Sequence, residues 1–148
     1  METTSPRALV VEDSPVIRRY IRRRLESSGW TVAEAKDAYE GQKAVRAHQP
    51  DLITLDLIMP INNGIDGLHL ASMIREELPE ATLLIVSGMA SASDVQSFLT
   101  RHKLEFFGKS ELPNFGGFAR LFARTDEILH ELNRHAEVAH REMKIVLN

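Results

Sequence analysis

The sequence predicts an α/β fold with a five-stranded parallel sheet covered by helices on both faces. Short apolar runs, typical of buried strands, alternate along the chain with segments of helical periodicity. Each strand is followed by a helix, so successive strands are joined by crossovers, which favour parallel pairing. Polar or charged residues also stand at, or directly after, the ends of four of the expected strands.

The expected strands are the apolar runs that lie at residues 8–11, 30–35, 51–56, 81–87 and 104–108. The fourth, ATLLIVS, is apolar almost throughout, as expected for a strand that is covered on both faces. The expected helices lie between and after them, at residues 15–28, 38–48, 67–78 and 93–101 and from 114 almost to 148.

Capping residues set the ends of several helices. Ser14 and Pro15 are a typical N-cap and first helical residue, and Gly29 ends the first helix. Pro50 and Pro79 follow the second and third helices and cannot continue them.

Composition narrows the function classes. The chain has 148 residues, 43% of them hydrophobic and 26% charged, with a net charge of −3 and no cysteine. These values indicate one globular domain and exclude disulfides, thiolate catalysis and cysteine-based zinc sites. We expect a cytoplasmic protein that binds neither nucleic acid nor membrane, because there is no global basic charge, no signal-peptide core in residues 1–7 and no membrane-spanning apolar run.

Polar residues follow four of the expected strands. Glu12 and Asp13 end the first, Asp56 ends the third, Ser87 ends the fourth and Lys109 follows the fifth. The carboxyl ends of parallel strands share one edge of the sheet, where the chemistry of such folds is found. Clustered carboxylates repel one another unless a cation neutralises them, and oxygen ligands suit Mg²⁺, or Mn²⁺ in its place. A carboxylate there can also attack phosphorus.

Four motifs carry a family resemblance: LVVEDS at residues 9–14, LDLIMP at 55–60, VSG at 86–88 and FFGK at 106–109. The chain resembles the response-regulator receiver domain, most closely the single-domain chemotaxis (CheY-like) type, over about residues 7–112. The resemblance implies a flavodoxin-like sheet with strand order 2-1-3-4-5. It also implies a tail at residues 1–6, a receiver domain at 7–132 and an extension of the last helix at 133–148.

The resemblance implies a phosphorylation site that uses Mg²⁺. Asp56 would be the phosphoacceptor. Asp13 would bind the metal directly and Glu12 through a water, with Asp56 and the backbone carbonyl of Ile58 completing the protein ligands. Glu12 stands where Asp is commoner in the family.

The resemblance also implies a switch. The Ser87 hydroxyl would move toward the phosphoryl group, Lys109 would pair with its charge, and Phe106 would change rotamer with Ser87. Ser110 follows Lys109 where the family usually has Pro, which puts the usual cis bond there in question.

Two further departures are specific to this sequence. Residues 61–66 separate Pro60 from Gly67, three more than usual, and the Asn62-Asn63-Gly64 run in that stretch reads as an added turn. Ile58 and Met89 are apolar where relatives carry side chains that admit or orient water. We therefore expect slow loss of the phosphoryl group.

The last helix carries an unbroken 4-3-4-3 apolar seam, typical of a coiled coil, at Phe118, Phe122, Thr125, Leu129, Leu132, Ala136, Ala139, Met143 and Val146. As one helix it would span roughly 44 Å, more than a small domain covers. Leu121 and Ile128 widen the stripe in its first half, which suits docking on the sheet. The pattern favours a homodimer or a partner helix over a frayed tail.

The leading hypothesis is therefore a phosphorylation-controlled switch of a two-component system, without an attached output domain. A histidine kinase, a phosphotransfer protein or acetyl phosphate would supply phosphate, and an unidentified downstream protein would read the signal. It would not be an enzyme with a separate substrate. The alternative is a structural or dimerising adapter whose long last helix is the main output. A haloacid-dehalogenase-type phosphatase is rejected because it needs a second Asp where Ile58 stands.

Overall fold

A computed structural model of the chain describes residues 5–87, 97, 100–101, 104–108 and 115–147. Five parallel strands form one sheet: β1 (Arg7–Val11), β2 (Thr31–Ala35), β3 (Leu52–Leu55), β4 (Thr82–Ser87) and β5 (Glu105–Gly108). The order β2-β1-β3-β4 is the expected one, and β5 pairs with β4 at the edge of the sheet.

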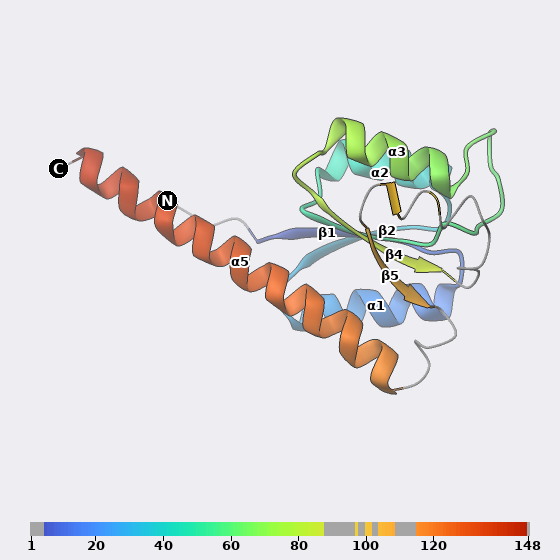
Figure 1. Ribbon diagram of the computed structural model, residues 1–148, viewed down its shortest axis with the longest axis horizontal. Coiled ribbons are helices and arrows are strands. Elements are labelled where there is room, and N and C mark those ends of the chain that lie inside the picture. Colours follow the sequence, from blue (N-terminus) through green and yellow to red (C-terminus); the bar gives the residue numbers. More distant parts are fainter. Residues whose placement is uncertain (1–4, 88–96, 98–99, 102–103, 109–114, 148) are drawn as a thin grey trace.

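The helices lie on both faces of this sheet (Figure 1). They are α1 (Pro15–Ser27), α2 (Ala38–His48), α3 (Gly67–Glu77) and α5 (Phe115–Leu147). In Figure 1, α2 and α3 lie on one side of the sheet, and α1 and α5 on the other. The helix expected at residues 93–101 lies almost entirely outside the described residues; 97, 100 and 101 are helical.

Local sequence accounts for the boundaries of the described helices and strands, which, the helix expected at 93–101 aside, lie within one residue of those expected. The Ser14 hydroxyl accepts a hydrogen bond from the Ile17 backbone N–H at 3.4 Å, and Pro15 begins α1. Asp37 and Asp66 cap α2 and α3 in the same way. Each cap satisfies a backbone donor that the first helical turn leaves without a partner.

Alternation along the strands divides the core into two layers. Leu9 and Val11 pack with Ile53 on the α2–α3 side, whereas Ala8 and Val10 pack on the α1–α5 side. Successive side chains of a strand point to opposite faces, so one short strand serves both layers. Burying each large aliphatic side chain contributes about 1.5–3 kcal/mol, which fixes the sheet on which the strand-end residues stand.

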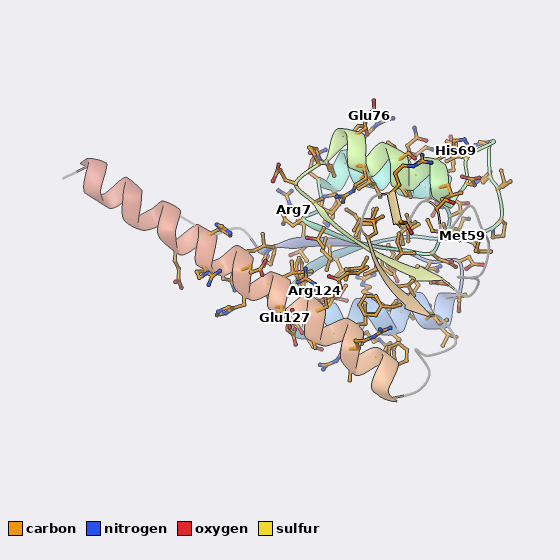
Figure 2. The ribbon with its side chains drawn as sticks, in the orientation of Figure 1. Arg7, Met59, His69, Glu76, Arg124 and Glu127 are labelled. Atoms are coloured by element: carbon orange, nitrogen blue, oxygen red, sulfur yellow. The ribbon has the colours of Figure 1, made fainter. Side chains whose placement is uncertain are left out.

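The first half of α5 docks on the sheet, as its wider apolar stripe predicts. Leu121, Phe122 and Ile128 are buried among α1 and sheet residues. An ion pair adds to this contact: Arg124 Nε lies 2.6 Å from the Glu105 carboxylate of β5, and Figure 2 labels Arg124 beside Glu127 on the same helix.

The second half of α5 extends past the sheet. The helix has 33 residues, and Figure 1 shows its C-terminal half projecting from the rest of the molecule. Leu132 is half-buried, and the side chains of residues 133–135 are exposed. Within the described part of the chain, no helix is both long and apolar enough to cross a membrane.

Candidate functional site

Three carboxylates meet at the carboxyl edge of the sheet. Glu12 and Asp13 directly follow β1, and Asp56 directly follows β3, the neighbouring strand. One carboxylate oxygen from each residue lies within 4.8 Å of the other two. Glu12 and Asp56 are each only 1% exposed, whereas Asp13 is exposed to solvent. The predicted acidic cluster is therefore assembled by strand pairing.

Backbone hydrogen bonds hold the cluster rigidly. The Glu12 N–H donates to the Ala35 carbonyl of β2, and the Asp56 N–H donates to the Val11 carbonyl of β1, each at 3.0 Å. These bonds extend the strand pairing by one residue into the site. The Asp56 side chain accepts a further hydrogen bond from the Ile58 N–H at 3.0 Å, which orients its carboxylate within the turn that follows β3.

The donor set fits a hard divalent cation. All three side chains offer oxygen, and two of them are buried, where like charges repel strongly. Mg²⁺ and Mn²⁺ prefer oxygen ligands and relieve this repulsion. Such a cation would offset the negative charge that the three carboxylates bring together.

The remaining predicted residues are placed in part. Ser87 is the last residue of β4 and pairs with Gly108, while Phe106 pairs with Ile85 two residues earlier along the same two strands. The chain thus brings the end of β4 next to β5. Lys109, Ser110 and Met89 lie outside the described residues.

The loop between β3 and α3 contains the turn that the sequence predicts. Asn62 and Ile65 exchange backbone hydrogen bonds, and the two residues between them, Asn63 and Gly64, have φ of 54° and 74°. Positive φ at both central positions is typical of a type I′ turn, for which Asn-Gly is the preferred sequence. Ile58 and Ile61 of this loop are 42% and 68% exposed.

Hydrogen bonds to Asp37 and Asp66, the N-caps of α2 and α3, tie this loop to the first turns of both helices. Asn62 donates a side-chain hydrogen bond to the Asp37 carboxylate at 3.0 Å. The hydrogen bond from the Glu40 N–H, and then the one from Asn62, lower the pKa of Asp37. Burial raises the pKa of Asp66, but the backbone and ring hydrogen bonds of His69 outweigh it and leave that pKa lowered. Both caps are therefore held as carboxylates at neutral pH.

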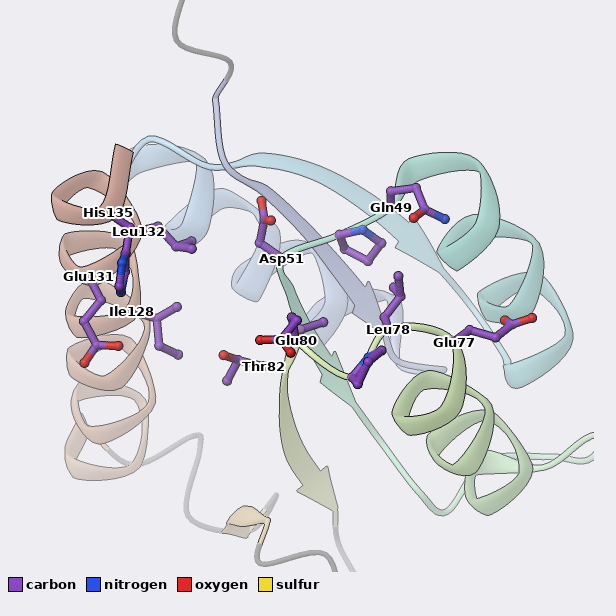
Figure 3. A pocket seen from close by; sticks show the side chains of 13 residues that line it. Gln49, Asp51, Glu77, Leu78, Glu80, Thr82, Ile128, Glu131, Leu132 and His135 are labelled. Carbon is purple, nitrogen blue, oxygen red and sulfur yellow. The ribbon is translucent and has the colours of Figure 1, made fainter. Parts of the chain in front are cut away.

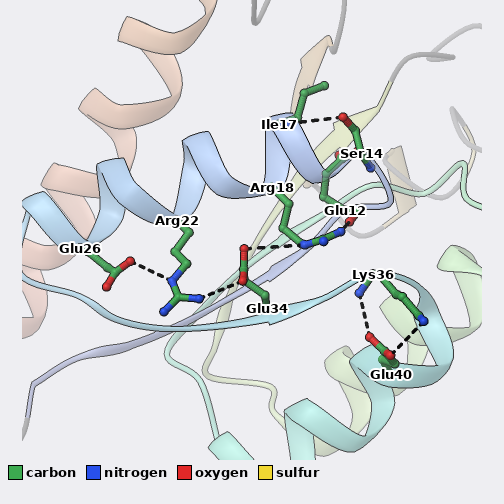
Figure 4. Close-up of polar contacts among 9 residues, drawn as sticks. All are labelled: Glu12, Ser14, Ile17, Arg18, Arg22, Glu26, Glu34, Lys36 and Glu40. Atoms are coloured by element: carbon green, nitrogen blue, oxygen red, sulfur yellow. Dashed lines mark hydrogen bonds and ion pairs between the residues drawn. The ribbon is translucent and has the colours of Figure 1, made fainter.

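Sequence reasoning missed one contact to the cluster. α1 carries five arginines, and two of them, Arg18 and Arg22, turn toward β2 (Figure 4). Arg18 Nη1 donates to the Glu12 backbone carbonyl at 2.8 Å. The signal lies in the spacing, since these two arginines are four residues apart on one helical face and Glu34 is the acidic residue of the otherwise neutral strand TVAEA.

A groove lies at the opposite edge of the sheet from the acidic cluster (Figure 3). It has a volume of about 630 Å³, and its walls come from the starts of β3 and β4 and from α5. Asp51, Thr82 and Ile128 face this space in Figure 3. The acidic cluster is at the carboxyl ends of the strands, so the groove takes no part in it.

Comparison with known proteins identifies the family. The profile of the response regulator receiver domain matches residues 8–114, which include all three carboxylates and both strands beside them. The chain belongs to the response regulator receiver domain family.

Curated relatives of this receiver domain are longer proteins. It is 31% identical over 147 residues to the transcriptional activator protein PfeR of Pseudomonas aeruginosa, covering 97% of this chain and 45% of that protein. It is 40% identical over 79 residues to a protein-glutamate methylesterase/protein-glutamine glutaminase of Natronomonas pharaonis, covering 53% of this chain and 21% of the relative. The receiver domain thus spans less than half the length of these relatives.

Solved structures agree with the receiver fold. A CheY-like receiver domain protein from Methanospirillum hungatei aligns with a TM-score of 0.73 at 20% identity, covering 89% of this chain and 99% of that one. The response regulator TrrA of Thermotoga maritima, solved in complex with Mg²⁺ and BeF, aligns with a TM-score of 0.59 at 28% identity. The alignment covers 79% of this chain and 98% of that one. An acidic cluster of this kind is typical of the Mg²⁺ site of receiver domains.

Proposed function

We propose that this receiver domain is a phosphorylation-dependent signalling switch that accepts a phosphoryl group on Asp56. One observation carries the proposal: Glu12, Asp13 and Asp56 bring carboxylate oxygens within 4.8 Å of one another at the carboxyl edge of the sheet. Family membership supports it, because receiver domains act as phosphoacceptors that partner with histidine kinases.

In the proposed reaction an Asp56 carboxylate oxygen attacks the phosphorus of the donor. A new oxygen–phosphorus bond forms, and the bond from phosphorus to the donor breaks, its electron pair leaving with the donor group. The hydrogen bond from the Ile58 N–H holds the Asp56 carboxylate in one orientation. A histidine kinase, a phosphotransfer protein or acetyl phosphate serves as donor.

Mg²⁺, or Mn²⁺ in its place, would be held by Asp13 and Asp56 directly, by Glu12 through water and by the Ile58 carbonyl. The exposure of Asp13 supports this assignment, because a direct ligand beside the entering phosphate has to be reachable from solvent. Glu12 is buried and accepts a hydrogen bond from the Ser14 N–H at 3.0 Å, which suits a residue that acts through an intervening water.

Ser87, Lys109 and Phe106 complete the proposed switch. Lys109 neutralises a phosphoryl oxygen, Ser87 donates its hydroxyl to another, and the Phe106 ring follows Ser87. The position of Ser87 at the end of β4, two strands from Asp13, supports this role. The receiver hydrolyses only its own phosphoryl group and turns over no separate substrate.

Phosphorylation with acetyl phosphate and Mg²⁺ tests the proposal. Wild-type protein should gain the mass of one phosphoryl group in intact-mass spectrometry, and Asp56→Asn should gain none. Asp51→Asn is the matched control, because Asp51 is an exposed carboxylate just before the opposite end of β3. Equal phosphorylation of Asp56→Asn and wild type refutes the assignment.

The output of the switch is proposed to be protein–protein contact in the cytoplasm, with residues 7–132 as the receiver and 133–148 as an extension. The length of α5 favours a second candidate function, an adapter that dimerises through this helix. A helix that outruns its sheet either buries its apolar seam against another helix or frays.

A further inference from the structure

We infer that Arg18 is a positioning residue for the metal site, acting through the peptide bond that joins Glu12 to Asp13. The inference rests on the proposed function, since it concerns how well these two residues hold a divalent cation. Arg18 cannot itself be a metal ligand, because a guanidinium cation has no lone pair to offer a metal ion.

The geometry places Arg18 against the backbone of the site. Its guanidinium extends from the first turn of α1 back to the end of β1, where Nη1 donates to the Glu12 carbonyl at 2.8 Å. That carbonyl belongs to the same peptide unit as the Asp13 N–H. A charge-assisted hydrogen bond therefore fixes the plane of this peptide and with it the direction of the Asp13 side chain.

A second contact steadies the guanidinium. Arg18 Nε lies 3.7 Å from Glu34 of β2, and the side chains of Arg18 and Glu34 are 20% and 25% exposed. Figure 4 shows Glu34 between Arg18 and Arg22. Arg22 holds the other Glu34 oxygen at 2.9 Å and also pairs with Glu26 at 2.8 Å. This chain of contacts therefore runs from the Glu12 backbone carbonyl through Arg18, Glu34 and Arg22 to Glu26, which is exposed to solvent.

The positive charge of Arg18 and its hydrogen bond predict opposite effects of its removal on metal affinity, so a measurement can tell the two roles apart. Removing a positive charge beside a cation site strengthens cation binding if charge alone matters. Removing a hydrogen bond that orients a ligand weakens it, and partners that orient metal ligands typically account for ten- to hundred-fold in affinity. Loss of Arg18 should therefore weaken metal binding although it makes the protein more negative.

The experiment measures Mn²⁺ affinity of the full chain by electron paramagnetic resonance of the free ion. Arg18→Ala should bind Mn²⁺ about ten-fold more weakly than wild type. Arg19→Ala is the matched control: it removes the same charge from the neighbouring, exposed position of α1, and its affinity should be equal to wild type or slightly higher. The amide resonance of Asp13 should shift in Arg18→Ala and stay in place in Arg19→Ala.

Glu34→Gln tests the same chain of contacts without removing the hydrogen bond. It should weaken Mn²⁺ binding by about two- to five-fold, which is less than the ten-fold loss expected for Arg18→Ala because the hydrogen bond to the Glu12 carbonyl remains. Combined with Arg18→Ala it should add nothing further, because Glu34 acts through Arg18. If Arg18→Ala does not fold, this variant alone carries the test.

The outcomes distinguish a failure of the proposed metal site from a failure of the positioning role of Arg18. Wild-type protein that binds no Mn²⁺ overturns the proposed metal site itself. Wild-type binding together with unchanged or tighter binding in Arg18→Ala overturns the positioning role alone. Unchanged affinity in a folded Glu34→Gln overturns the contribution of Glu34 and, if Arg18→Ala does not fold, the positioning role of Arg18 as well.

Discussion

Gly67→Ala should destabilise the fold and disturb the phosphorylation site, although alanine is the better helix former. Gly67 is buried at the first position of α3, against the residue that follows Asp56. A Cβ there would lie 2.6 Å from Leu57 Cα and 2.8 Å from its carbonyl carbon, and closer still to its carbonyl oxygen. All three atoms are backbone, so no side chain can rotate away.

The size of the effect follows from two opposing terms. The Leu57 Cα has to retreat from 2.6 Å to the 3.4 Å at which ordinary contact begins, a shift of 0.8 Å. Overpacking of this kind costs about 1–3 kcal/mol, and the helix propensity of alanine returns about 1 kcal/mol. Because the clashing atoms are backbone, the cost lies toward the upper end of that range, and we expect a net loss of about 2 kcal/mol, or about 4–8 °C in Tm for a domain of this size.

Urea denaturation measures this loss through the fluorescence of Trp30, the single tryptophan, which is 3% exposed. Gly64→Ala is the control, because a Cβ at Gly64 meets nothing within 4 Å but sits at φ +74°. That variant should lose about 1 kcal/mol through backbone strain and phosphorylate like wild type. Gly67→Ala should also phosphorylate more slowly. A Gly67→Ala protein that is as stable as wild type refutes the steric argument.

Three other predictions concern the α2 cap, the lifetime of the phosphoryl group and the last helix. Because the pKa of Asp37 is lowered in the folded protein, its carboxylate stabilises the fold fully above the unfolded-state pKa of 3.8, and this stabilisation is lost as pH falls through the folded-state pKa. Asp37→Ala should therefore cost about 1 kcal/mol of stability at pH 7. In urea titrations, the difference in stability between this variant and wild type should narrow below about pH 3.8. Ile58→Asn with Met89→Glu should lose its phosphoryl group several-fold faster than wild type once donor is removed, whereas Ile61→Asn, on the same loop and 68% exposed, should not; unchanged decay in the double variant contradicts the prediction. Met143→Glu on the α5 seam should shift a dimer to monomer in light scattering, while Arg141→Gln, which changes the net charge equally on the opposite face, should leave it dimeric; full-length protein that is monomeric at high micromolar concentration contradicts dimerisation.

Local patterns account for most of the fold. Ser14-Pro15 and Gly29 bracket α1 because capping and backbone freedom act within a few residues. The Asn63-Gly64 turn follows from the same kind of local preference. The acidic cluster was also predictable, because parallel strands bring their carboxyl ends to one edge, and the positions of Glu12, Asp13 and Asp56 in the chain are enough to place them there.

The order of residues along the chain is enough to show which residues stand at the ends of the strands and therefore which carboxylates meet. Which long side chains turn toward them depends on how the helices and loops pack in three dimensions. Arg18 and Arg19 are chemically identical neighbours, yet one contacts the Glu12 carbonyl and the other is exposed. Likewise Asn62 reaches Asp37 across 25 residues. Such contacts depend on the angle at which α1 crosses β2 and on where a loop folds back, and these are set by the packing of the whole core rather than by local propensity.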